Sequence, residues 1–594
     1  MDIYSDRISK YAQVAELHRK RALLLSTLRG VCFVLLAICA YEFFQTRDLP
    51  FLFATLLAVV LFIFLINRHQ KHDYLRQLNA TLADLNSEER ERLVLNLSGF
   101  DEGNRFKITN HQNQEDLDIL GKHSLFQLLN RCGLEDSMKL LTDWLSNAVP
   151  IKTIKERQEC IKELMSDLDW LQDLEAKIRI AVQQKKKHEP AANSADLLNW
   201  ATKLNQLKAP IVWRVAALVL TLITLVLTGL IIQGSLTYQF IYGVILVNGI
   251  LLGVVLGRLS KQTKGIDIAK YIISSYKLSI EAIISKKYVD PNLSALVKQI
   301  QQPSNALKGI SELSKITLRV SARSNVFYFL LDIIFLLDIH LLIKIESWKK
   351  HYGPHLEKWL DTIHEMEVLA SISSFAHAQK HYTFPKLEEG FVLKGEEIGH
   401  PLIPANKRVC NDYTIEGKGS IDIITGSNMS GKSTFQRTLG INLILGRTGA
   451  PVCAKSFTMS NIIVFTSMRT KDNLEENTSS FYAELKRIKQ LLEIVEHNPV
   501  FFLLDEILKG TNSDDRHLGA VELIKKLSYK SAFGLISTHD LTLGNLEKSK
   551  NNIRNFSFNS EIIDDKITFD YLLTPGPCKS FNASQLMRNL GIID

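Results

Sequence analysis

The sequence predicts a mixed fold, in which an α-helical region with membrane segments is followed by a C-terminal α/β domain. Two tandem pairs of apolar runs in the first half of the chain predict the membrane segments. A strand, a glycine-rich turn and a helix follow one another at residues 421–440, and a later apolar strand ends in two adjacent carboxylates. Strands that alternate with helices in this way are typical of a parallel sheet covered by helices.

The composition limits the class of protein only in part. The chain has 594 residues, enough for several domains, with 46% hydrophobic and 23% charged residues. Its formal net charge of +8 is compatible with nucleic acid or an anionic membrane, but basic residues beside membrane segments give the same surplus. The seven cysteines are scattered and odd in number, with no CxxC pair, which favours a reducing compartment without a disulfide framework or a zinc site.

Two apolar runs near the N-terminus predict a transmembrane hairpin. Residues 30–45 and 49–66 are separated by a short polar turn, and a helical span needs about 20 apolar residues. The second run is long enough, whereas the first is short and carries Glu42 near its end. Buried core helices are the alternative for this pair. A cleavable signal peptide is a further alternative for the first run, although a second span follows at once.

A second hairpin is predicted at residues 211–232 and 238–257, where Arg214 is the one charged residue and an uncharged turn joins the two runs. Four spans are therefore the simplest count. Lysine and arginine flank the outer ends of both hairpins, while the connecting turns hold little positive charge. By the positive-inside tendency, we expect a multi-pass protein of the cell (inner) membrane with the termini and the middle segment in the cytoplasm.

Two further segments each have two interpretations. The apolar run at 326–345 contains Asp332, Asp338 and His340, and charged groups are costly in lipid. We interpret it as a long amphipathic core helix, with a membrane span as the alternative. The lysine run at 185–187 is interpreted as a solvated face or linker, with a DNA contact as the alternative.

The strand–turn–helix segment carries the pattern GxxxxGK[ST] at residues 426–433. Its glycines, Gly426 and Gly431, allow consecutive backbone NH groups and the helix N-terminus to face a phosphate chain. Lys432 is then expected to reach the β and γ phosphates, and the Ser433 hydroxyl to bind Mg²⁺, with Thr434 following in the binding loop. The pattern therefore predicts an ATP site that depends on Mg²⁺.

A second motif supplies groups for hydrolysis. The apolar residues 501–504 form a strand that ends in Asp505 and Glu506, the Walker B arrangement. Asp505 is expected to hold Mg²⁺, and Glu506 to activate the attacking water as general base. His539 follows the next strand and is expected at the γ-phosphate or the water, because parallel strands end beside the ligand. An ordinary loop histidine is the alternative.

These motifs resemble the MutS family of DNA mismatch-repair ATPases, an ABC-like branch of P-loop proteins. The resemblance rests on TGSNMSGKST at 425–434, LLDEILKGTNSDD at 503–515 and STH at 537–539. It implies that Asn428 contacts the nucleotide and that Asn411 and Asp412 lie near the adenine.

The stretch DNLEENTSSFYAELKRIKQLL is similar to the STF..E segment of that family, with Ser479, Ser480, Phe481 and Glu484 in matching places. The resemblance implies that Ser479 reaches across a dimer to the γ-phosphate of the partner's nucleotide. From its residues alone, the stretch predicts only a helix with a polar N-terminal cap. The match covers roughly residues 115–180 and 360–590.

The chain also departs from the family pattern. A membrane hairpin stands where the mismatch-reading domain is expected, and residues 211–257 fall where the family's levers carry a clamp for DNA. We expect no terminal helix-turn-helix support for a dimer after residue 590. Leu508 and Lys509 replace a usual GRG lead-in, and Ser430 replaces a glycine in a loop that often needs unusual backbone angles.

We therefore expect five parts: an N-terminal region at 1–90 with its hairpin at about 30–66, a first helical core at 91–210, a second hairpin at 211–258, a helical lever at 259–384, and the ATPase domain at 385–594. The first functional hypothesis is a membrane-anchored homodimeric ATPase that uses ATP and Mg²⁺ and acts on DNA. The second is an ATP-driven transport or mechanochemical protein with no nucleic-acid role. The third is a scaffold that binds ATP and barely hydrolyses it.

Overall fold

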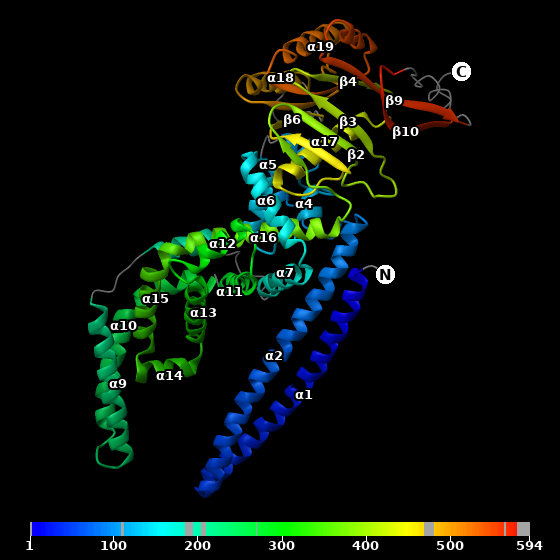
Figure 1. The fold of residues 1–594 in the computed structure, drawn as a ribbon. Coiled ribbons are helices and arrows are strands. Elements are labelled where there is room, and N and C mark those ends of the chain that lie inside the picture. Colours follow the sequence, from blue (N-terminus) through cyan, green and yellow to red (C-terminus); the bar gives the residue numbers. More distant parts are fainter. Residues whose placement is uncertain are drawn as a thin grey trace. The chain divides into compact units, whose positions relative to one another are not determined.

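The computed structural model describes residues 3–108, 112–183, 194–203, 209–268, 270–468, 480–563 and 566–578. Its elements fall into two compact units (Figure 1). The first unit comprises Met1–Arg90, Gly133–Ser137 and Asp169–Glu367, and its described elements are all helices. The second comprises Glu91–Cys132, Met138–Leu168 and Val368–Asp594, and contains two sheets with their helices. The prediction of a helical region followed by an α/β region is confirmed.

The first unit begins with two long helices, α1 (Ile3–Thr46) and α2 (Leu49–Leu93), that run side by side (Figure 1). Near their apolar ends the rings of Phe33 and Phe62 lie 6.0 Å apart. In the polar half, Nδ1 of His18 lies 2.9 Å from Nδ1 of His72. The two helices therefore form a hairpin along both their apolar and their polar parts.

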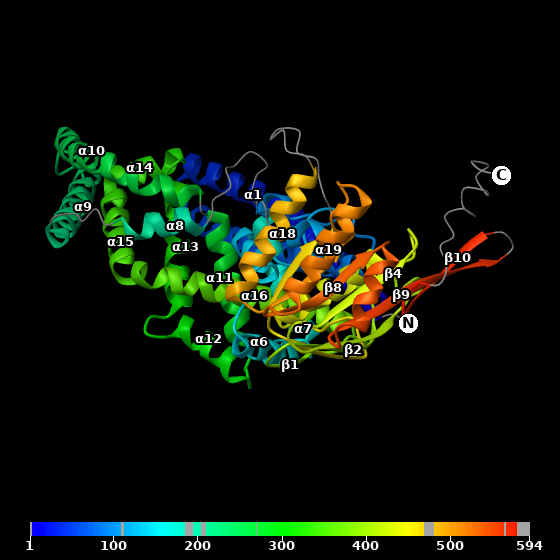
Figure 2. The same ribbon diagram turned by 90° about the horizontal axis from the view of Figure 1, so that it is seen from above.

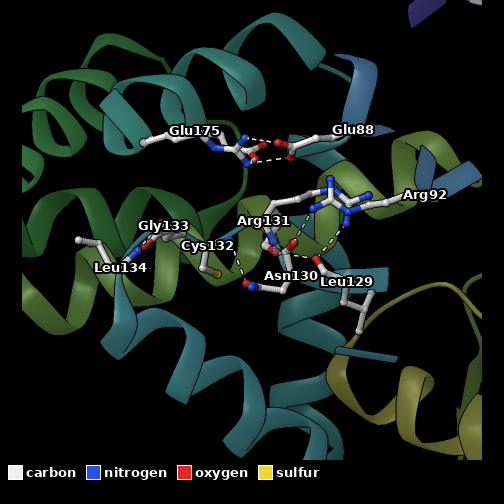
Figure 3. A network of polar contacts seen from close by, with 12 residues as sticks. Glu88, Arg92, Leu129, Asn130, Arg131, Cys132, Gly133, Leu134 and Glu175 are labelled. Atoms are coloured by element: carbon white, nitrogen blue, oxygen red, sulfur yellow. Dashed lines mark hydrogen bonds and ion pairs between the residues drawn. The ribbon is translucent and has the colours of Figure 1, made fainter. Parts of the chain in front are cut away.

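The polar half of this hairpin is fixed to α7 (Leu168–Gln183) through one glutamine. Arg7 Nε donates to Gln172 Oε1 at 3.1 Å, and Asn86 Nδ2 donates to the same oxygen at 3.0 Å. In the same unit, Glu88 of α2 and Glu175 of α7 both pair with Arg179. Figure 3 shows the two glutamates facing this guanidinium.

A second hairpin consists of α9 (Pro210–Ile232) and α10 (Gln239–Ile268). With α1 and α2, these make four helices in the described part of the chain that are long and apolar enough to cross a membrane. Only 6–11% of the most apolar stretch of each helix is buried. Packing inside this chain therefore does not explain their apolar composition, which argues against the alternative of core helices.

Shorter helices complete the first unit. They are α8 (Ser194–Thr202), α11 (Lys270–Ser285), α12 (Pro291–Gln301), α13 (Ala306–Ala322), α14 (Val326–Phe335), α15 (Leu337–Tyr352) and the first part of α16 (Leu356–Ala378). α13 shows the expected amphipathic pattern, because Ile310, Leu313, Ile316 and Val320 recur at helical spacing and are buried.

The prediction of one long core helix at residues 326–345 is wrong. The chain bends by 87° between α14 and the helix that starts at Leu337. Leu336 lies at the bend in the left-handed region, with φ 51°. The Asp332 carboxylate accepts a 2.8 Å hydrogen bond from the backbone NH of Asp338, so the aspartate caps the second helix and does not continue the first. Most apolar side chains of α14 are exposed, which is also contrary to a core helix.

The second unit begins with short helices, namely α3 (Gln112–Asp116), α4 (Leu125–Leu129), α5 (Glu135–Ser146) and α6 (Ile151–Leu164). Ser124 and Gln127 form a capping box at the start of α4. Arg92 Nη2 donates to the carbonyl of Asn130 at 3.0 Å, and the Asn130 side chain accepts from the Cys132 NH at 3.0 Å (Figure 3). These contacts fix the loop after α4 within this unit.

The larger sheet has six strands in the order β10-β9-β4-β8-β7-β6. These strands are β4 (Ile421–Gly426), β6 (Ile463–Ser467), β7 (Val500–Asp505), β8 (Ala532–Thr538), β9 (Ile553–Ile563) and β10 (Lys566–Pro575). All neighbours are parallel except β9 and β10. β4 and β8 are buried along their whole length, as expected for parallel strands covered on both faces.

Three long helices cover this sheet: α17 (Lys432–Thr448), α18 (Ser480–His497) and α19 (Ser513–Leu527). Phe502 and Leu504 of β7 pack in one apolar cluster with Leu491 of α18 and Ile524 of α19. The helices α18 and α19 lie next to each other in Figure 2. Leu503 points to the opposite face, where a Cβ at Gly440 of α17 would meet its Cδ1 at 2.9 Å.

A smaller sheet has four strands in the order β1-β5-β2-β3. They are β1 (Lys386–Glu388), β2 (Val392–Ile398), β3 (Asn411–Glu416) and β5 (Ser456–Ser460). Because β4, β7 and β8 are parallel and adjacent, their carboxyl ends meet at one edge of the larger sheet. That edge is where ligands bind in sheets of this type.

Candidate nucleotide-binding site

A tight loop joins β4 to α17 and contains the predicted phosphate-binding residues. Gly431 precedes the helix with φ 106°, and a Cβ there would lie 3.1 Å from the Tyr571 ring. A Cβ on Gly426 would lie 2.8 Å from the carbonyl of Phe558. Both positions therefore require glycine. The strained non-glycine residue of the loop is Met429, with φ 68°, and not Ser430. Ser430 is buried, and within the described residues its hydroxyl has no hydrogen-bond partner.

Lys432 is the first residue of α17, and its side chain folds back over the loop. Its ammonium donates to the carbonyls of Gly426 and Ser427, both at 2.9 Å. The residue is only 4% exposed. Burial lowers the pKa of Lys432, while the nearby carboxylates of Glu506 and Asp505 act in the opposite direction. A lysine in this position is ready to exchange two loop carbonyls for anionic oxygens.

Ser433 and Asp505 meet across the carboxyl edge of the sheet. Ser433 Oγ donates to Asp505 Oδ2 at 2.7 Å. The other carboxylate oxygen of Asp505 accepts a short hydrogen bond from the Ser537 hydroxyl at the end of β8. A hydroxyl and a carboxylate in contact are oxygen donors of the kind that Mg²⁺ prefers, with water and phosphate oxygens completing its shell. The donor set therefore fits this ion.

Glu506 lies between two cationic or hydrogen-bonding side chains. His539 Nε2 lies 3.0 Å from Glu506 Oε1, and Lys509 Nζ lies 2.8 Å from Oε2. The hydrogen bond from His539 lowers the pKa of Glu506, burial opposes this change, and Lys509 lowers it further, to about 2. Glu506 has φ 51°, an uncommon conformation for a residue other than glycine. The backbone therefore holds this carboxylate in a fixed place beside β8.

A pocket of about 570 Å³ opens beside these groups. The sequence-predicted residues that line it are Asn411, Asn428, Gly431, Lys432, Ser433, Thr434 and Glu506. Three other predicted residues contact a residue that lines the pocket: Gly426 contacts Lys432, Asp505 contacts Ser433, and His539 contacts Glu506. The structure thus brings ten of the predicted positions to one place. Ser479 lies outside the described residues.

The two asparagines of the pocket have different surroundings. Asn428 is exposed in the loop. The side chain of Asn411 is held by β10, because its Nδ2 donates to the carbonyl of Tyr571 at 3.1 Å and its Oδ1 accepts from the NH of Leu573 at 2.7 Å. Asp412 points elsewhere and accepts a 2.7 Å hydrogen bond from the NH of Glu397. Asn411 therefore lines the pocket, whereas Asp412 does not.

The structure adds residues that the sequence did not indicate. The pocket is also lined by His400 and Lys407, from the loop between β2 and β3, and by Tyr571 of β10. Lys509 contacts the carboxylate of Glu506, and Ser537 contacts that of Asp505. Burial lowers the pKa of His400 to about 4, so its ring is neutral near pH 7. Nothing in the sequence marks Tyr571 as a neighbour of the loop.

Glu484 connects α18 to the segment after β7. Its carboxylate accepts a short hydrogen bond from the backbone NH of Leu508, and the residue is 6% exposed. Burial raises the pKa of Glu484, while its hydrogen bonds with the backbone act against this change. Phe481 packs on the same segment, where a Cβ at Gly510 would meet its Cβ at 2.5 Å. The start of α18 therefore positions the turn that carries Glu506 and Lys509.

Comparison with known proteins agrees with this geometry. Residues 422–587 match the family described as MutS domain V. DNA mismatch repair protein MutS of Aquifex pyrophilus is 30% identical over 221 residues, which cover 36% of this chain and 26% of that protein. The MutS of Geobacillus sp. is 28% identical over 247 residues, covering 41% and 28%.

A eukaryotic relative shows the same extent of similarity. MutS protein homolog 4 of Mus musculus is 32% identical over 234 residues, covering 37% of this chain and 24% of that protein. The chain therefore spans between 24% and 28% of the length of these three relatives. The matched family segment contains the β4–α17 loop, both carboxylates and His539.

Proposed function

We propose that this chain is a membrane-anchored ATP hydrolase of the MutS family whose activity depends on Mg²⁺, because residues 422–587 match the family described as MutS domain V. We further propose that its ATPase domains act as a homodimer and that the ATP cycle drives a conformational change linked to DNA binding or repair. The observation that carries the proposal is the convergence of Lys432, Ser433 with Asp505, and Glu506 with His539 at one edge of the sheet.

Nucleotide binding uses the β4–α17 loop, in the manner of an ABC-like P-loop domain. Lys432 exchanges its contacts with the two loop carbonyls for the β and γ phosphate oxygens of ATP. Asn428 and Thr434 are exposed beside this position and supply further polar contacts. Ser433 and Asp505 would hold the metal ion, which would neutralise phosphate charge.

Hydrolysis requires a base for the attacking water, and Glu506 is placed for this role. With a pKa of about 2, its carboxylate is ionised near pH 7 but weakly basic. Loss of the contact with Lys509 increases its basicity, because that lysine is one of the groups that lower the pKa. His539 remains as the hydrogen-bond partner that fixes Oε1 while the other oxygen faces the water.

The pocket also offers groups for a nucleobase. A Cβ on Gly431 would meet the Tyr571 ring, the Asn411 side chain bonds to the backbone of Tyr571, and neutral His400 also lines the pocket. Ligand sites commonly combine an aromatic side chain with a few placed hydrogen-bonding groups. We therefore assign Asn411 to the adenine side of the site.

A second copy of the chain completes the site. Ser479 directly precedes α18 and, by its likeness to the family segment, contacts the γ-phosphate bound to the other copy. Glu484 lies in the first turns of the same helix and holds the backbone next to Lys509. Contact between Ser479 and the partner's nucleotide is thereby linked, through α18, to Glu506, the general base of the chain's own site.

A second candidate is an ATP-driven transport or mechanochemical protein without a nucleic-acid role. The observation that favours it is that the family match covers residues 422–587, so all four apolar helices lie outside the matched segment. In that case the ATPase domain moves membrane helices and no DNA is bound.

The ATPase rate of the full chain in lipid vesicles distinguishes the two candidates. The rate is measured with and without homoduplex, mismatched and branched DNA over a series of salt concentrations, with Lys432→Ala as the inactive control. Stimulation by DNA that decreases as salt rises supports the DNA-linked function, because phosphate contacts release counterions. A rate that depends on lipid and is indifferent to every DNA supports the second candidate.

A further inference from the structure

We propose that α14 is a third membrane element, which enters the lipid leaflet on the cytoplasmic side and returns to that side without crossing. The inference rests on the proposed membrane insertion of α9 and α10. The surface concerned, called here the α14 face, consists of Val326, Phe327, Phe329, Leu330 and Leu331. Their exposed fractions are 74%, 73%, 61%, 53% and 47%, in that order. A patch of five large apolar side chains this exposed marks an interaction site.

The charges beside the α14 face are paired inside the fold. Arg323 donates to both oxygens of Asp338, at 2.9 and 2.8 Å, and the Tyr328 hydroxyl donates to Asp338 Oδ1 at 2.9 Å. Asp332, the one charged residue of α14, is 6% exposed and accepts the NH of Asp338. α14 therefore shows no charged side chain to its surroundings, which is the condition for a helix in hydrocarbon.

The connection of α14 shows why it returns. It joins α13 to α15, which run alongside each other (Figure 1). At the end away from α14, Trp348 Nε1 donates to the carbonyl of Gly309 at 2.7 Å, and at the α14 end Arg323 pairs with Asp338. Because α13 and α15 are linked at both ends, the chain reaches α14 along α13 and returns along α15 to the side from which it came.

The α14 face continues the apolar surface of the second hairpin. Asn248 of α10 is fully buried, and its Nδ2 donates to the carbonyl of Ile333 in α14 at 2.9 Å and to Thr224 Oγ1 of α9 at 3.3 Å. Interhelical hydrogen bonds from asparagine are a common link between membrane helices. On α10, Leu246 and Ile250 are 66% and 60% exposed on a face of the helix away from Asn248, so the hairpin that holds α14 also has an exposed apolar surface.

Basic residues precede the α14 face and favour a bilayer as its partner. Lys315 and Arg319 are exposed on α13, in the turns that lead to α14. In a membrane these side chains reach the anionic phosphates of the headgroups, while α14 lies deeper among the acyl chains. A protein partner would not need this sequence of basic residues followed by an apolar helix that exposes no charge.

The test uses the full chain in vesicles of phosphatidylethanolamine and phosphatidylglycerol, with a benzophenone amino acid in place of Phe329, Leu222 or Tyr529. Leu222 of α9 is 63% exposed and reports on the hairpin, and Tyr529 of the ATPase region is 75% exposed and serves as the aqueous control. After irradiation, we expect a gain of phospholipid mass at positions 329 and 222 and none at 529.

Other outcomes overturn the proposal in distinct ways. Lipid at position 222 but none at 329, or a cross-linked dimer through 329, rejects the α14 assignment and leaves the membrane anchor intact. Absence of lipid at both positions rejects the anchor itself and α14 with it.

Sidedness is tested separately with Ser324→Cys and Ser347→Cys, scored as the increase over the parent chain with an impermeant maleimide. Re-entry requires labelling of both positions in inside-out vesicles. Labelling of one position from each side would show that the α14–α15 segment crosses, and would overturn the proposal.

Discussion

Lys509 Nζ lies 2.8 Å from Glu506 Oε2, and so a cation neutralises the carboxylate that is placed to activate water. The other oxygen of this carboxylate, Oε1, lies 3.0 Å from His539 Nε2. A general base paired with a lysine is a weak base, and the ion pair must loosen before the proton can be taken. The Lys509 contact therefore sets a resting state of the site.

Replacement of Lys509 by methionine is expected to raise the pKa of Glu506, because one of the groups that lower it is removed. When the solution is acidified, a base with a higher pKa becomes protonated, and so inactive, at a higher pH. The acidic limb of the pH–rate profile should therefore move to higher pH. Lys530→Met, which removes an exposed ion pair with Glu496, is the matched control. Superimposable profiles for Lys509→Met and the parent would show that the ion pair has no part in catalysis.

Glu506→Gln should abolish turnover and keep nucleotide binding. Loss of a general base costs roughly 10²- to 10⁴-fold in kcat. The amide still accepts and donates hydrogen bonds, so ATP should remain bound and be retained on a filter. Glu496→Gln, on the surface of α18, is the control. A rate within a few fold of the parent would exclude Glu506 from the chemical step.

Glu484→Ala is expected to lower kcat and leave the dissociation constant of ATP nearly unchanged. The substitution removes the acceptor of the Leu508 NH, so the turn carrying Glu506 and Lys509 loses its support. Glu484→Gln keeps an acceptor oxygen and should restore most of the rate. If kcat falls equally in both variants, or if the affinity for ATP falls together with kcat, Glu484 does not act by positioning this turn.

An ion pair with a buried carboxylate in the larger sheet offers a test of stability. Asp422 of β4 is fully buried and bonds to Arg554 at 2.9 and 2.7 Å and to the Tyr413 hydroxyl at 2.6 Å, whereas the Arg554 side chain is 43% exposed. Arg554→Leu removes the charge-assisted hydrogen bonds of this carboxylate and should lower the free energy of unfolding by about 1.5–3 kcal/mol. Lys394→Ala removes a surface pair with Glu416 and should cost less than about 1 kcal/mol. Equal changes in the unfolding midpoint would contradict the assignment.

The contribution of Glu367 to stability should fall as the pH rises from about 4.5 to about 7. Burial raises the pKa of Glu367 from its ordinary 4.5 to about 7, while the nearby Ser137 side chain and hydrogen bonds from the NH groups of Gly133 and Leu134 oppose this change. In that range the unfolded carboxyl is ionised and the folded one still holds its proton, so the folded state binds more protons. Deprotonation then favours unfolding, by about 3 kcal/mol across the range.

Glu367→Gln removes this titration and keeps an oxygen for the NH of Gly133, which lies 2.6 Å from the carboxylate. The Tm of the variant should therefore exceed that of the parent at pH 8 and approach it at pH 4.5. A difference in Tm that is constant across the pH range would show that Glu367 does not titrate on unfolding.

Local motifs made much of the ATPase region predictable. Lys432 and Ser433 follow a glycine turn after a buried strand, and Asp505 and Glu506 stand at the end of a later apolar strand, so the parallel-sheet rule alone places them at one edge. Tyr571 and His400 reach the pocket through pairing of β10 with β9 and through the loop after β2, and no short-range pattern encodes such contacts.

The bend at Leu336 was unpredictable for a different reason. No glycine or proline marks it, and Asp332 and Asp338 are compatible with the period of one continuous helix. Only the tertiary contacts with Arg323 and Tyr328 show that the two aspartates face inward at a corner. Helix period predicts which face is apolar, but not where the axis turns.

The most direct test of the composite ATP site mixes two variants, Lys432→Ala and Ser479→Ala. Each alone should be inactive, because one lacks the phosphate-binding lysine and the other the serine that acts across the dimer. In a mixed dimer one site combines both defects, and the other site has an intact Lys432 and an intact Ser479. The account predicts that ATPase activity returns on mixing and rises with protein concentration. Two inactive variants that stay inactive when mixed, or a fully active Ser479→Ala variant, would contradict it.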